Sequence, residues 1–237
     1  MNEKKLLQIF FYSGILMLLI YAIFAVVFHG AHFADGADTF IRLLSGKNFT
    51  FIDPIRGHTV FVHNIFALFG IKAGIRDISI LSRLNTLGFA VNNILGWTVA
   101  IAYSYKIKRL DYLLYTLMMS SLTLILCGFF MHIESISAIG VFWALFLYFL
   151  NYNSKESSSL AKAGVVLLCI FSTRLHDSFI FFSILLLIVL IYRVFKKEVS
   201  VDFFIITAGI TQLAAFRIAI NGVINPRDPI NAGNALV

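Results

Sequence analysis

The sequence predicts an all-α integral membrane protein with about seven transmembrane helices. Hydrophobic residues make up 59% of its 237 residues and charged residues only 13%. This composition leaves too little polar surface to cover a soluble domain of that size. The mean hydropathy is +0.89. Apolar runs of bilayer-spanning length also recur along the chain, and short basic clusters separate them, as in multi-spanning proteins.

The net charge of +7 does not indicate a nucleic-acid partner. The Lys and Arg residues lie between apolar runs rather than on a basic stripe with interleaved aromatic residues. That placement is typical of topology signals and of contact with anionic membrane lipids. Cys127 and Cys169 each lie inside an apolar run without CxxC spacing. We therefore expect both cysteines to act as small buried hydrophobic residues.

The first apolar run, residues 6–28, is close to the ~20 residues needed to cross a bilayer and is predicted to be an uncleaved anchor. Lys4 and Lys5 precede it, which places the N-terminus in the cytoplasm by the positive-inside rule. The loop at 29–83 then faces outward. Within it, two short segments are predicted to form interfacial helices, at 37–45 and 59–70.

Six further spans are expected to alternate across the membrane, at 84–105, 113–131, 136–150, 163–175, 179–192 and 203–220. A basic cluster from Lys106 to Arg109 follows the second span and marks the cytoplasmic side. This cluster and the N-terminal lysines lie on the same side of the membrane only if the segment at 59–70 does not cross the bilayer. We expect one domain over 1–237, and, since the chain stops just after a span, part of a longer protein.

Three asparagines lie inside the span predicted at 84–105: Asn85, Asn92 and Asn93. A carboxamide is costly in hydrocarbon unless it finds a hydrogen-bond partner on another helix. The sequence therefore predicts that these three side chains face neighbouring helices rather than lipid.

Two carboxylates in the outer loop are candidates for catalysis. Asp35 and Asp38 are three residues apart, so on a helix one would act as general base while the other orients it or a metal. Asp38 also precedes an apolar-periodic run, where an aspartate commonly caps a helix. Because capping explains Asp38 without chemistry, we favour Asp35 as the base.

Ionisable residues also gather where later spans reach the outer face. His132 and Glu134 follow the third span, and Arg174, His176 and Asp177 lie at the outer end of the fifth. Arg174 is expected either to bind a phosphate bidentately or to pair locally with Asp177. Asp, His and Glu on one face also suit a divalent metal, but no HExxH or other fixed ligand spacing is present. The sequence therefore leaves a metal cofactor open.

The order of these parts resembles the GT-C superfamily of multi-spanning glycosyltransferases. The resemblance runs from Lys4 to about Tyr192: an anchor, an acidic outer loop, a helix ending LLSGKNF, a second helix HTVFVHNIFALFG, and the span SRLNTLGFAVNNILGWTVAIAYSYK. It implies a catalytic aspartate in the first outer loop, here Asp35 or Asp38. It also implies that Glu134 matches an acidic residue at the outer end of the third span, and that the sugar donor is carried on a polyprenyl phosphate.

The function implied is transfer of a sugar from that donor to a glycan, lipid or protein acceptor in the cell envelope, at the outer face of a bacterial inner membrane. A phosphate donor needs fixed cations near the outer surface. The residues expected to bind it are Arg42, Arg56, His58, His132, Arg174 and His176.

Two other classes stay open. A polysaccharide polymerase or ligase of another fold would have a similar basic outer face. A transporter or non-enzymatic scaffold would place ionisable groups near the middle of its spans. Only Arg217 lies well inside an apolar run, which favours the enzyme over the transporter.

Overall fold

The computed structural model describes residues 2–30, 35–46, 56–127 and 134–224, and every regular element in these ranges is a helix. This confirms the predicted all-α fold. The elements, in chain order, are α1 (Glu3–Val27), α2 (Asp35–Gly46), α3 (Gly57–Lys72), α4 (Ile78–Lys106), α5 (Leu110–Ser121), the π-helical turn η2 (Leu122–Cys127), α6 (Glu134–Asn151), α7 (Ser159–Ser172), α8 (Phe179–Phe195) and α9 (Phe203–Ile224).

Three helices of the described residues are long and apolar enough to cross a bilayer: α1, α4 and α9. Shorter apolar helices are found at 135–151, 159–172 and 179–195. By length and composition, these helices identify a membrane protein.

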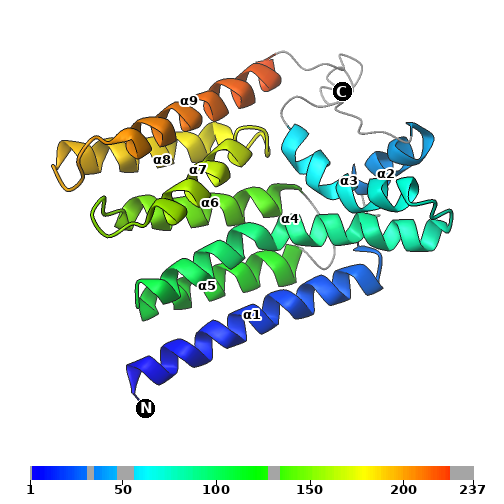
Figure 1. Ribbon diagram of the computed structural model, residues 1–237, viewed down its shortest axis with the longest axis horizontal. Coiled ribbons are helices and arrows are strands. Elements are labelled where there is room, and N and C mark those ends of the chain that lie inside the picture. Colours follow the sequence, from blue (N-terminus) through cyan, green and yellow to red (C-terminus); the bar gives the residue numbers. More distant parts are fainter. Residues whose placement is uncertain (1, 31–34, 47–55, 128–133, 225–237) are drawn as a thin grey trace.

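Helix α4 lies in the middle of the bundle (Figure 1). Helix α1 runs antiparallel along it, as three contacts at different depths show. The rings of Phe11 and Tyr105 stack with centroids 4.4 Å apart, Asn93 Nδ2 donates to the Tyr21 hydroxyl at 3.0 Å, and the His29 ring hydrogen-bonds to Ser82. Asparagines 85, 92 and 93 are fully buried, which confirms that they face other helices.

Glycines allow α3 and α6 to approach α4 closely. A Cβ on Gly96 would overlap the backbone of Gly140 in α6, and a Cβ on Gly88 would overlap the carbonyl oxygen of His63 in α3. Small residues at such crossings let membrane helices pack backbone to backbone. Helix α4 is thus the element against which both neighbours are aligned.

Helices α2 and α3 gather at the end of the bundle where α4 begins (Figure 1); we call this the α2–α3 end. Helix α2 packs on α3 through Phe40 and Leu43, which contact a cluster that includes Ala67 and Leu68. The two short helices predicted in the first loop are therefore present. The opposite end, where α1 begins and α4 finishes, is called the N-terminal end.

A polar cluster ties α6, α7 and α9 together at the N-terminal end. The Asp202 carboxylate accepts hydrogen bonds from the Tyr152 hydroxyl at 2.6 Å and Ser154 Oγ at 3.1 Å, and from the backbone N–H of Ile205 at 2.9 Å. Lys162 Nζ lies 3.6 Å from it. Burial raises the pKa of Asp202, but these hydrogen bonds and the nearby ammonium outweigh burial and lower it overall.

Candidate functional site

The start of α3 docks onto the connection between α7 and α8, at the α2–α3 end of the bundle. The backbone N–H of His58 donates to the carbonyl of Arg174 at 3.1 Å. Thr59 Oγ1 donates to the carbonyl of Leu175 at 2.7 Å, and both of these residues are fully buried. These bonds join segments more than one hundred residues apart in the chain, so the docking is a tertiary feature.

His58 is held by the last turn of α7. Its Nδ1 lies 3.0 Å from the carbonyl oxygen of Phe171, and its ring stacks on the Phe171 ring with centroids 6.0 Å apart. A carbonyl only accepts, so Nδ1 carries a proton. In the neutral ring, Nε2 is then the acceptor, able to take a hydrogen bond or a proton from a ligand.

Arg56 pairs with Asp177 across the same junction. Arg56 Nη2 lies 3.4 Å from Asp177 Oδ2, and the two side chains are 27% and 34% exposed. This corrects the local pairing of Arg174 with Asp177 that the sequence offered as one alternative. Docking of α3 brings Arg56 to Asp177, whereas the side chain of Arg174 is exposed and forms no ion pair with any residue that the structure describes.

His176 closes the turn that starts α8. Its Nδ1 accepts a hydrogen bond from the backbone N–H of Ser178 at 3.1 Å and lies 3.1 Å from Ser178 Oγ. This role is structural, so any contact of His176 with a ligand would come from the rest of the ring.

The structure thus brings together four residues that the sequence proposed for donor binding: Arg56, His58, Arg174 and His176. Arg42 lies on α2 and is exposed. His132 lies outside the described residues. The side chains of Asp35, Asp38 and Glu134 lie outside them as well, although all three backbones are placed, at the starts of α2 and α6.

One sequence argument is wrong. Asp38 was expected to cap a helix starting just after it, but α2 begins at Asp35, so Asp38 lies in the first turn. The physical reason is that aspartate is favoured in the first turn of a helix as well as at the cap. The ground for favouring Asp35 over Asp38 is therefore lost, and both stay candidates.

Two contributors to this junction were not singled out from the sequence. Thr59 and Phe171 look like ordinary helix residues, and only the docking of α3 gives them partners. In the described part of the chain, no group of three or more His, Cys, Asp or Glu residues is arranged to hold a metal ion. The described residues therefore do not support a metal cofactor.

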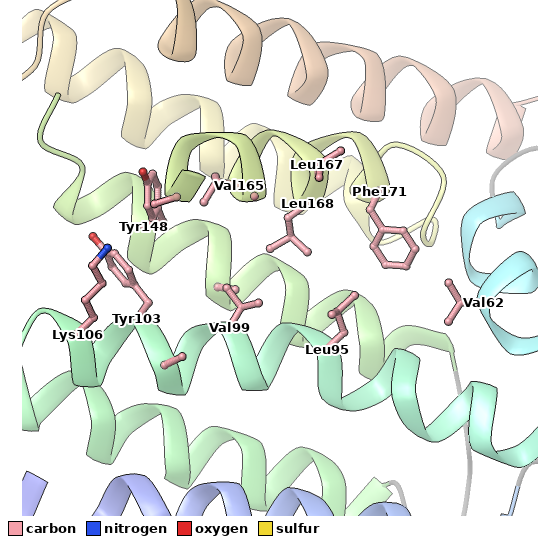
Figure 2. Close-up of a pocket in the computed structure, with 14 residues that line it drawn as sticks. Val62, Leu95, Val99, Tyr103, Lys106, Tyr148, Val165, Leu167, Leu168 and Phe171 are labelled. Carbon is pink, nitrogen blue, oxygen red and sulfur yellow. The ribbon is translucent and has the colours of Figure 1, made fainter. Parts of the chain in front are cut away.

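An apolar groove leads to this junction between α4, α6 and α7. It has a volume of about 590 Å³. Figure 2 shows Val62, Leu95 and Phe171 at one end and Tyr103 and Lys106 at the other. Leu95 and Lys106 are about three turns apart on α4, roughly 16 Å, so the groove follows the helices rather than crossing them.

The groove is open to the surface of the bundle. Leu167, which lines it, is 66% exposed, and Gly164 beside it is exposed too. In a bilayer such an opening would face hydrocarbon, so the chemistry it accepts is that of an alkyl or polyprenyl chain. Phe171, which lines this end, is hydrogen-bonded to His58 through its carbonyl oxygen, and the backbone of Arg174 is hydrogen-bonded to the same histidine.

No protein-family model, curated protein or solved structure matches this chain.

Proposed function

We propose that this protein is a membrane glycosyltransferase whose sugar donor is carried on a polyprenyl phosphate, as the GT-C resemblance implies. The observation that carries the proposal is the apolar groove that ends at Phe171, where Phe171 holds His58 at the junction to which Arg56 and Arg174 belong. A hydrocarbon slot leading to a cationic cluster is complementary to a lipid phosphate: the chain lies among apolar side chains and the phosphate meets arginine.

The two arginines are not equivalent in this proposal. Asp177 partly neutralises Arg56, whereas Arg174 is exposed and offers its guanidinium fork to phosphate oxygens. His58 Nε2 is available for a further hydrogen bond to the phosphate or the sugar. We assign donor binding to these residues, with Arg42, His132 and His176 as further candidates.

The reaction needs a base and a stabilised leaving group. A hydroxyl of the acceptor attacks the anomeric carbon, the bond from that carbon to the phosphate oxygen breaks, and the lipid phosphate leaves with the bonding electrons. Asp35, Asp38 or Glu134 takes the hydroxyl proton. The cations at the junction stabilise the negative charge that develops on the leaving phosphate. The acceptor is a glycan, a lipid or a protein.

We further propose seven crossings of a bacterial inner membrane: α1, α4, α5 with η2, α6, α7, α8 and α9. The N-terminal end is then cytoplasmic, and α2 and α3 are interfacial helices at the outer face. Basic residues support this orientation, because Lys4, Lys106 and Lys197 all belong to the N-terminal end. Single cysteines at Ser45 and Lys108, in a background without Cys127 and Cys169, should react with an impermeant reagent from opposite sides. Labelling of both from one side would overturn the topology.

The proposed function is tested by filling the groove. A Cβ on Gly164 would meet nothing within 4 Å, so Gly164→Leu puts a side chain into the groove without a clash. Gly209→Leu is the matched control, since a Cβ there also meets nothing within 4 Å and Gly209 lies on α9, away from the groove. Both changes add helix propensity equally.

Binding of a polyprenyl-phosphate sugar to the purified protein, and transfer of radiolabelled sugar from it, would be measured for both variants. Gly164→Leu should weaken donor binding about tenfold or more, because the leucine side chain occupies space in the groove that the hydrocarbon chain of the donor would fill, while Gly209→Leu should resemble the parent protein. Equal effects of the two variants would exclude the groove as the donor site. A parent protein that binds no polyprenyl phosphate would exclude the proposed function.

A further inference from the structure

A second cavity lies at the N-terminal end of the bundle, between the first turns of α1 and the last turn of α4. Its volume is about 510 Å³. Leu7 and Tyr105 are its more buried walls, and Tyr105 also stacks on Phe11. The residues that line it are Asn2, Glu3, Lys4, Leu7, Tyr105, Lys106 and Lys108.

The cavity is positively charged. Three lysines line it against one glutamate, and none of Lys4, Lys106 and Lys108 forms an ion pair with another residue of the described ranges. Of the other cations at this end, Arg109 pairs with Asp111 and Arg193 with Glu198 at 2.9 Å, whereas Lys155, Lys196 and Lys197 form no ion pair within the described ranges. What distinguishes Lys4, Lys106 and Lys108 from the other unpaired lysines is that they line one cavity together.

The positive end of the α1 dipole adds to this charge. Asn2 caps the helix by accepting a hydrogen bond from the backbone N–H of Lys4, and the N–H groups of the first turn carry the partial positive charge of the helix N-terminus. Lysine side chains at the end of a membrane helix also extend toward the lipid headgroups with their alkyl stems on apolar surface.

We propose that this cavity binds the phosphate-bearing headgroup of an anionic membrane lipid. The three ammonium groups would hold the phosphate, and Leu7 and Tyr105 would contact the glycerol and the first carbons of the acyl chains. A free phosphate ion uses the lysines alone, whereas a lipid uses both the cations and the apolar walls. The proposal does not rest on the glycosyltransferase function, because the cavity lies at the opposite end of α4 from the α3 junction, although Lys106 lines both the cavity and the end of the groove far from that junction.

Two triple variants test it, each removing three positive charges from the N-terminal end. K4Q/K106Q/K108Q removes the lysines of the cavity, and K155Q/K196Q/K197Q removes exposed lysines that do not line it. Binding of phosphatidylglycerol to protein in neutral detergent would be measured by native mass spectrometry. The first variant should bind about 100-fold more weakly than the parent, and the second should stay within about twofold of it.

Two further ligands test whether the cavity recognises a whole anionic lipid, the acyl chains alone or a free phosphate ion. Phosphatidylcholine shares the acyl chains but has no net charge, and inorganic phosphate has the charge but no chains. Both should bind much more weakly than phosphatidylglycerol. Equal binding of phosphatidylcholine, or equal binding of inorganic phosphate, would overturn the proposal of an anionic lipid. An equal loss in the two triple variants would do the same.

Footprinting of the parent protein keeps the test decisive if a variant does not fold. An amine-reactive reagent should modify Lys4, Lys106 and Lys108 more slowly when phosphatidylglycerol is present. Lys155, Lys196 and Lys197 should be modified at the same rate with and without the lipid. Protection of all six lysines alike would mean a diffuse charge effect, and protection of none would mean no site; either result overturns the proposal.

Discussion

His63 of α3 and Asn92 of α4 form a hydrogen bond between two fully buried side chains. Asn92 Nδ2 donates to His63 Nε2 at 3.0 Å, and the His63 ring also stacks on Phe89 with centroids 3.5 Å apart. The bond fixes how α3 lies along α4, and therefore where the start of α3 meets the connection between α7 and α8.

We expect Asn92→Leu to destabilise the protein by about 1 to 2 kcal/mol, because it leaves a buried imidazole nitrogen without its donor. Asn85→Leu is the matched control. Both polar atoms of Asn85 are buried and form no hydrogen bond within the part of the chain that the structure describes, so an apolar side chain of similar size should leave stability unchanged or raise it. Thermal unfolding in detergent would compare the two. A larger loss for Asn85→Leu would contradict this account of the buried polar residues.

The α4–α6 crossing depends on the absence of a side chain at position 96. Gly96→Ala should lower Tm, because its methyl group would overlap the Gly140 backbone, which cannot turn aside as a flexible side chain can. Overpacking of this kind typically costs about 1 to 3 kcal/mol. Gly209→Ala adds the same methyl group where space is open, and should leave Tm unchanged or raise it. A stable Gly96→Ala variant would show that the helices separate easily.

The stability of the N-terminal end should depend on pH through Asp202. Its pKa is lower in the folded protein than the ordinary value of about 3.9. Its ionised form therefore stabilises the fold fully above that value, and the stabilisation is lost as the pH falls through the lower, folded pKa.

Asp202→Asn should consequently cost about 2 kcal/mol at neutral pH, and the difference in Tm from the parent should shrink below about pH 4. Asp111→Asn is the control, since Asp111 likewise lies beside a cation, Arg109, but is 48% exposed, and it should have the smaller effect. A deficit in Asp202→Asn that is constant from pH 7 to pH 3 would exclude the ionised carboxylate as its cause.

The catalytic base should be found among three carboxylates. Asp35→Asn, Asp38→Asn and Glu134→Gln would each be assayed for transfer of sugar from a polyprenyl-phosphate donor and for binding of that donor. Loss of the base should lower turnover by roughly 10²- to 10⁴-fold with little change in donor binding. A variant that only weakens the start of a helix should lower Tm slightly and keep turnover. If all three variants stayed active, the proposed chemistry would be wrong.

Arg174 should be hard to replace even by lysine. Its backbone carbonyl, not its side chain, holds the start of α3, so Arg174→Lys should fold normally. It should still weaken donor binding, since an ammonium cannot make the two parallel hydrogen bonds of a guanidinium. Arg83→Lys makes the same change at an exposed position of α4 and should have little effect. Equal affinities for the two variants, over a range of salt concentrations, would remove Arg174 from the donor site.

Much of the helical architecture follows from local sequence. Apolar runs predicted most helices to within about four residues, because a segment in lipid must satisfy its backbone hydrogen bonds internally. Two predictions were less accurate: α4 begins at Ile78 rather than at residue 84, and the span predicted at 113–131 is α5 followed by the π-helical turn η2 in its described part. Asn92 and Asn93 inside one such run were enough to indicate a face turned toward other helices, since a carboxamide in hydrocarbon needs a partner. The basic clusters likewise marked the N-terminal end.

Only the tertiary structure decided which distant residues meet. Arg56 pairs with Asp177 although Arg174 is much closer to it in sequence, because the hydrogen bonds of His58 and Thr59 fix the start of α3 at that turn. The groove beside Phe171 exists because α6, rather than α7, packs closely on α4 at Gly96. Local sequence determines where a helix forms, because backbone hydrogen bonding and hydropathy act over a few residues. Which helices touch depends on side-chain shape across the whole bundle, and no single segment encodes that.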